Sequence, residues 1–147
     1  MIRDRRVPSD IRARLDRLAE HYRGDKRVVA VYLFGSYARA CEGPLSDVDV
    51  ALLARGVPAG DLSGAGLDYV TEVIRLLGTD EVSFVLLNTA PLTLRYEVVR
   101  GGRLLLDNDP PARIAFEAHT EDLYLDFKPL LDAYDQELLR QLAGSST

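Results

Sequence analysis

The hydrophobic positions of this chain recur first with a helical period and then in short, dense runs. Between Ile11 and Tyr22, apolar side chains are spaced by four, three and four residues, which predicts an amphipathic helix. Ser9 or Asp10 can cap the start of this helix, and Gly24 is placed to end it. The first predicted element is therefore a helix with one apolar face.

Three runs rich in β-branched and aromatic residues predict buried strands over Arg27–Phe34, Asp47–Ala54 and Glu81–Asn88. A Gly-Ser turn and a polar loop are expected between the first two strands. An amphipathic helix over Leu67–Gly78 separates the second strand from the third. Its expected buried face consists of Leu67, Val70, Ile74 and Leu77.

The rest of the chain predicts a short helix after Pro91, a brief edge strand over residues 103–106 and a helical segment from about residue 109. Pro129 is expected to kink or break that last helix, because proline has no backbone N–H to donate. This order of elements predicts an α/β (α+β) fold, in which helices flank a small mixed β-sheet. Residues 1–147 are expected to form a single domain.

The composition is that of an ordinary globular protein: the 147 residues are 47% hydrophobic. The single cysteine, Cys41, excludes an internal disulfide, and no apolar run reaches the roughly 18 residues of a membrane span. No apolar segment typical of a secretory signal is present near Met1, so we expect a cytoplasmic protein without a membrane partner. The net charge of −5 argues against direct nucleic-acid binding.

The charge is unevenly distributed along the chain. Residues 1–27 carry nine Arg and Lys against five Asp and Glu, whereas residues 107–147 carry three against nine. Two interpretations are open. The charges either belong to two solvated helical faces or form a bipolar surface that orients a charged partner.

Two carboxylates, Asp47 and Asp49, begin the second predicted strand, although the rest of that strand is apolar. Residues i and i+2 of a strand project to the same face, so the two carboxylates lie side by side and repel each other unless a cation compensates. Mg²⁺ suits such oxygen ligands and takes its remaining ligands from water and substrate phosphates. The pair therefore favours metal-assisted phosphoryl or nucleotidyl transfer, although an isolated Asp pair is also common as a loop cap.

Residues upstream of the two aspartates are suited to binding phosphate. Gly35 follows a buried strand and allows the backbone to approach a ligand closely. The Ser36 hydroxyl and neighbouring N–H groups can hold phosphate oxygens, and Arg39 can reach the same anion. Together these features predict a phosphate-binding turn after one strand and a metal site on the next.

The spacing of Gly35-Ser36, ten residues and then Asp47-Val48-Asp49 resembles the signature of the polymerase-β-like nucleotidyltransferase superfamily. It is most similar to the small prokaryotic branch of minimal nucleotidyltransferases (MNT). The stretches "LLNTAPLTLRYEVVRGGRLLLDND" and "FEAHTEDLYLDFKPLLDAY" resemble the second half of that branch.

The resemblance implies that Gly35 and Ser36 bind the nucleotide triphosphate and that Asp47 and Asp49 bind Mg²⁺. It implies ATP as the substrate and, as the partner, a HEPN-domain ribonuclease toxin encoded nearby. Characterised members transfer AMP to a tyrosine of that toxin and act as its antitoxin. The expected function is therefore AMP transfer from ATP to a hydroxyl, and it is compatible with an oligomer that contains the toxin.

The superfamily usually has a third carboxylate on the next strand, where it positions the attacking hydroxyl and can act as base. Alignment of the apolar run puts Ser83 at this place. Glu81 has the same strand parity, one step nearer the strand start, and is the preferred third catalytic acid; Asp80 has the opposite parity. The remaining alternative is that no third acid exists.

Two other functions follow from these alternatives. A chain with a weak or inactive site would neutralise the toxin by binding it. A chain with an active site could instead transfer a nucleotide to a small molecule, such as an antibiotic hydroxyl.

Overall fold

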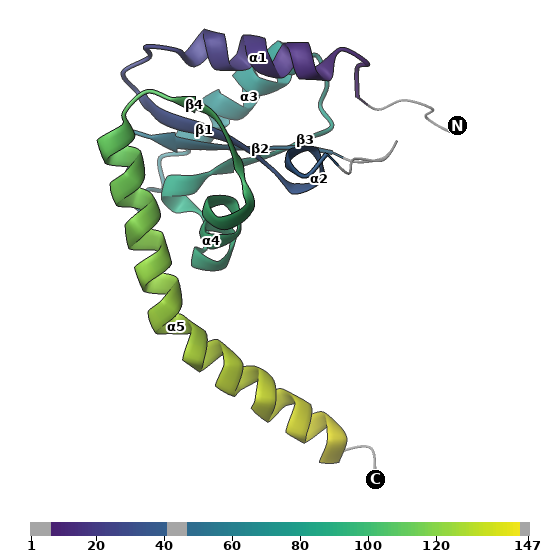
Figure 1. Ribbon diagram of the computed structural model, residues 1–147, viewed down its shortest axis with the longest axis vertical. Coiled ribbons are helices and arrows are strands. Elements are labelled where there is room, and N and C mark those ends of the chain that lie inside the picture. The colour runs from purple at the N-terminus through teal and green to yellow at the C-terminus, as the bar shows by residue number, and fades with distance from the viewer. Residues whose placement is uncertain (1–6, 41–46, 145–147) are drawn as a thin grey trace.

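A computed structural model describes residues 7–40 and 47–144, and its centre is a four-stranded sheet with the strand order β3-β2-β1-β4 (Figure 1). The strands are β1 (Val28–Phe34), β2 (Val48–Ala54), β3 (Val82–Leu86) and β4 (Arg103–Asp107). β1 runs antiparallel to both β2 and β4, whereas β2 and β3 are parallel. The sheet is mixed, as predicted, and the short last strand lies at its edge.

Helices α1 (Ile11–Tyr22) and α3 (Ala65–Leu77) cover one face of the sheet (Figure 1). The larger apolar cluster lies between these helices and the sheet. Val48, Val50 and Leu52 of β2 all belong to this cluster, because alternate residues of a strand share a face. Asp49 is therefore on the other face of β2.

The buried face of α3 differs from the predicted one. Leu67 is 69% exposed, whereas Tyr69, Val73 and Leu77 are buried. The Tyr69 ring packs edge-on against Tyr22 of α1, with 6.2 Å between ring centroids. Packing against α1 thus places an aromatic ring, with its larger apolar area, where the sequence pattern favoured Leu67.

Helices α4 (Leu92–Gly101) and α5 (Pro110–Gly144) lie on the opposite side of the sheet from α1 (Figure 1). A second apolar cluster joins this face of the sheet to both helices. It contains Tyr32, Phe34, Ala51, Leu53 and Val98, with Phe116 packed against it. Asp49 shares this face of β2 with Ala51 and Leu53, so α4 and α5 cover the side of the sheet on which Asp49 lies.

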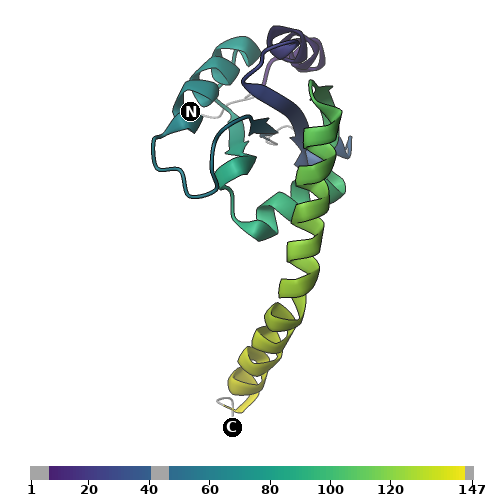
Figure 2. The same ribbon diagram turned by 90° about the vertical axis from the view of Figure 1, so that its left-hand side faces the viewer.

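Helix α5 is continuous through Pro129 and is therefore not broken there. Its axis changes direction about halfway along, as Figures 1 and 2 show. Of the two predicted alternatives, a kink or a break, the helix therefore has a kink. Beyond the bend the helix leaves the rest of the molecule. None of the described helices combines the length and apolar character that crossing a membrane requires.

The connection after β1 contains a one-turn helix, α2 (Gly35–Ala38), where a simple turn was predicted. A second short element, the 3₁₀ turn η1 (Leu87–Thr89), follows β3. Cys41 lies outside the described residues. The site predicted from sequence is thus built from the ends of β1 and β2 and from α2.

Candidate functional site

The end of β1 and the start of β2 lie side by side, since Phe34 pairs with Asp49 in the antiparallel register. Gly35 follows directly and has a φ of +69°, a conformation that L side chains rarely adopt. A Cβ atom at this position would also collide with the Asp49 carboxylate. The chain therefore needs glycine here for two reasons, and the Gly35 backbone lies against Asp49.

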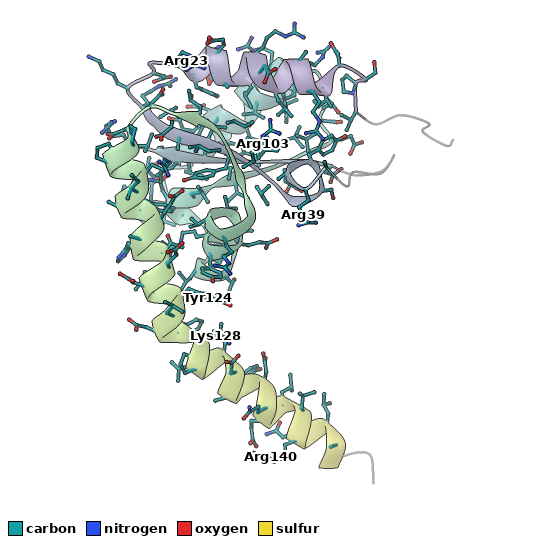
Figure 3. All side chains as sticks on the ribbon, in the orientation of Figure 1. Arg23, Arg39, Arg103, Tyr124, Lys128 and Arg140 are labelled. Atoms are coloured by element: carbon teal, nitrogen blue, oxygen red, sulfur yellow. The ribbon has the colours of Figure 1, made fainter. Side chains whose placement is uncertain are left out.

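The helix α2 is held by the apolar core and by α1. The Tyr37 ring is buried in the main apolar cluster, and the Arg12 guanidinium lies 5.3 Å from the ring centroid. Arg12 also donates a hydrogen bond of 3.1 Å to the Tyr37 carbonyl oxygen. This packing fixes the turn, on which Ser36 is half-buried. Arg39 follows it and is exposed (Figure 3).

The two predicted metal ligands differ in their surroundings. Asp47 is exposed, whereas Asp49 is half-buried. Burial raises the pKa of the Asp49 carboxyl above its usual range, the charges of Asp47 and Glu97 raise it further, and Arg39 partly opposes them. A half-buried carboxylate beside two other carboxylates is a position that a bound cation would stabilise.

The position of the third carboxylate depends on the register of β2 and β3. Asp49 lies beside Ser83 in the parallel pairing, so a hydroxyl stands at the position where the resemblance predicts an acid. The Val48 amide donates to the Glu81 carbonyl oxygen at 3.1 Å, and Glu81 directly precedes β3, two residues before Ser83. Asp80 has the opposite parity and is exposed.

Glu97 is a carboxylate near the site that the sequence analysis missed. It lies on α4, next to Val98, which is buried in the same apolar cluster as Phe34. That packing brings Glu97 close enough to Asp49 to raise the pKa of the Asp49 carboxyl. No motif marks Glu97 in the sequence, because its proximity depends on how α4 packs on the sheet.

The residues present fit a magnesium ion that is only partly coordinated by protein. Across residues 7–40 and 47–144, no group of three or more His, Cys, Asp or Glu side chains is arranged to hold a metal, and these residues form no pocket. Mg²⁺ commonly takes one or two carboxylates and completes its shell with water and substrate phosphates. Asp47 and Asp49 match that donor set.

Comparison with protein families places these features in a known group. The family "Polymerase beta, Nucleotidyltransferase" matches residues 16–111, which include Gly35, Asp47 and Asp49. The chain belongs to this nucleotidyltransferase family. The match covers α2 and all four strands, so the predicted fold class is confirmed.

Solved structures share the nucleotidyltransferase fold over most of the chain. A toxin–antitoxin with AMP-PNP is 23% identical, covers 88% of this chain and 97% of its own, and has a TM-score of 0.65. A tri-AMPylated Shewanella oneidensis HEPN toxin in complex with MNT antitoxin gives 21% identity, 88% and 98% coverage and a TM-score of 0.66. The toxin–antitoxin MntA-HepT is 21% identical, covers 87% of this chain and 98% of its own, and has a TM-score of 0.66. Comparison with curated proteins gives no match.

Proposed function

We propose that this protein is a Mg²⁺-dependent nucleotidyltransferase that transfers AMP from ATP to a tyrosine hydroxyl of a HEPN-type toxin and thereby acts as an antitoxin. The observation that carries the proposal is the contact of the Gly35 backbone with the half-buried Asp49 carboxylate, beside Asp47. The family match and the fold shared with MNT antitoxins support it. The proposal includes a cytoplasmic location, where both ATP and a ribonuclease toxin would be found.

In this proposal the residues around α2 bind the triphosphate. The Ser36 hydroxyl and the Arg39 guanidinium donate to phosphate oxygens. Because Gly35 has no side chain, its backbone lies against the Asp49 carboxylate and keeps the phosphate-binding turn next to the metal ligands. Asp47 and Asp49 would hold Mg²⁺, which when bound stabilises negative charge on the phosphate oxygens. The acceptor oxygen forms a bond to the α-phosphorus and loses its proton to a base, for which Glu81 is the candidate. The bond between the α-phosphorus and the oxygen that bridges to the β-phosphate breaks, and pyrophosphate leaves.

The test is a transfer assay with this protein, the HEPN-type protein that the proposal expects to be encoded nearby, Mg²⁺ and ATP labelled in its α-phosphate. We expect the label to appear on a tyrosine of the partner and pyrophosphate to be released. Label on neither protein, together with full neutralisation of the toxin, would instead support an antitoxin that acts by binding. The Ser83 hydroxyl beside Asp49 is the observation that favours this second candidate.

The third carboxylate can be identified by comparing Glu81→Gln, Glu97→Gln and Ser83→Ala in the same assay. We expect Glu81→Gln to slow transfer about 100-fold, because a positioned base that accepts the hydroxyl proton contributes at least that much. Ser83→Ala and Glu97→Gln should stay close to the wild-type rate, and none of the three should weaken AMP-PNP binding.

A loss of transfer in Glu97→Gln alone would assign the third carboxylate to α4. Rates close to wild type in all three variants would exclude both Glu81 and Glu97 as the third acid.

A further inference from the structure

The second half of α5 extends away from the rest of the molecule (Figures 1 and 2). We call residues 125–141 the projecting segment. Every residue in it is exposed except the half-buried Leu131. In folded proteins most helical stability comes from packing of an apolar face against other elements. The other described residues of this chain supply little such packing to the projecting segment.

One side of the projecting segment is apolar. Phe127, Leu130, Tyr134 and Leu138 follow one another at intervals of three or four residues and therefore share a face, which we call the apolar stripe. Their exposed fractions are 39%, 65%, 67% and 43% in that order. A stripe of this kind on an exposed helix is typical of a surface that packs against another helix.

The apolar stripe continues the face by which the first half of α5 packs on the sheet. Phe116 packs against the second apolar cluster, and Thr120 is buried. Tyr124 stacks on Tyr96 of α4 with 3.7 Å between ring centroids, and Figure 3 shows Tyr124 on the α4 side of the helix. The same face is thus covered by α4 and β1 at one end of α5 and exposed at the other.

The charges of α5 indicate which kind of partner can pack on the apolar stripe. Residues 121–141 carry six Asp and Glu but only two cations, Lys128 and Arg140. Both cations pair within the helix, Lys128 with Asp132 at 2.9 Å and Arg140 with Glu137 at 2.9 Å. The projecting segment therefore presents a net negative charge to a partner.

Acidic residues lie along both borders of the stripe. At 3.6 residues per turn, Asp126 and Glu137 border one edge and Asp135 borders the other. A second copy of this chain, or an anionic lipid surface, would bring like charges together on both edges. A helix with an apolar face bordered by Lys and Arg would bring opposite charges together instead.

The apolar stripe also lies on the same side of the sheet as the candidate site. The face of α5 that it continues packs on the side of the sheet that carries Asp49. Beyond the bend, α5 leans toward the side on which α4 lies, as Figure 1 shows. A partner that packs on the stripe would therefore lie on the same side of the sheet as Asp49.

We propose that the apolar stripe of α5 is the surface on which this protein docks a helix of its partner, one with an apolar face bordered by Lys and Arg. The proposal rests on the proposed function, in which the acceptor is a protein. Docking on the stripe holds the partner on the Asp49 side of the sheet.

The test compares two pairs of substitutions at positions of similar exposure. Leu130→Gln with Leu138→Gln removes apolar area from the stripe. Leu125→Gln with Leu139→Gln removes it from the other side of the helix, where the two leucines are 61% and 66% exposed. The probe is the purified HEPN-type protein that the proposed function expects to be encoded nearby. We expect its Kd to rise about 100-fold or more with the stripe pair and less than about threefold with the control pair.

Equal affinity of the two variants for the probe would overturn the proposal, as would a wild-type homodimer that only the stripe pair disrupts. No binding of the probe by the wild-type chain would overturn both this proposal and the proposed function. Measurements of AMP-PNP binding and of AMP transfer distinguish a failure of the docking proposal from a failure of the proposed function. An intact complex without transfer counts against the proposed function alone, whereas a stripe pair that loses the complex but still binds AMP-PNP supports docking on α5.

Discussion

Asp49→Asn is expected to lower the rate of AMP transfer about a thousandfold or more while the chain stays folded. Asparagine keeps the size of the side chain but removes the negative charge that would hold Mg²⁺ beside the triphosphate. Asp47→Asn should have a similar effect, because the two carboxylates act on the same ion in the proposed function. The measurement is transfer of α-labelled AMP to the HEPN-type partner, with Asp68→Asn on the exposed side of α3 as the control.

The same Asp49 substitution is expected to raise the stability of the metal-free protein. The pKa of the Asp49 carboxyl is raised by burial and by Asp47 and Glu97, so its ionised form disfavours the folded state at neutral pH. The neutral amide removes that cost. Thermal unfolding with a chelator should therefore show a higher Tm for Asp49→Asn, whereas Mg²⁺ with AMP-PNP should stabilise only the wild type.

Two results would contradict this account of the site. An Asp49→Asn variant with wild-type transfer would exclude Asp49 as a metal ligand. A variant that unfolds at a lower temperature than the wild type, with the chelator present, would show that Asp49 stabilises the fold rather than serving the site.

Gly35→Ala is expected to lose AMP-PNP binding and to be destabilised by more than about 2 kcal/mol. The φ of +69° is unfavourable for alanine, and the added Cβ would collide with the Asp49 carboxylate. Either β1 or Asp49 must then move, and both the phosphate-binding turn and the metal site change. Chemical denaturation measures the stability change, and calorimetric titration with AMP-PNP measures binding.

Gly24→Ala is the matched control. Gly24 has a φ of +76°, but nothing lies within 4 Å of a Cβ atom placed there. This variant should lose only about 1–2 kcal/mol of stability, because a positive φ is unfavourable for alanine, and it should keep wild-type AMP-PNP affinity. If the two variants behave alike, the close approach of Gly35 to Asp49 has no role in nucleotide binding.

The local elements were largely predictable, because each depends on the period of apolar residues within a short segment. The first helix and all four strands lie close to their predicted ranges. The prediction that Leu67 of α3 is buried was wrong. Packing against Tyr22 of α1 decides which residues of α3 reach the core. Pro129 bends α5 without ending it, as the helix regains its regular bonding beyond the proline.

The strand pattern and the spacing of Gly35-Ser36 and Asp47-Val48-Asp49 could be predicted from the sequence, since an i, i+2 pair on a strand and a glycine after a strand are local features. The groups that surround Asp49 could not be predicted in this way. The parallel register of β2 and β3 places Ser83 beside it, and the packing of α4 brings Glu97 near. Register and helix packing depend on contacts between residues far apart in the chain, and no local period of apolar residues encodes such contacts.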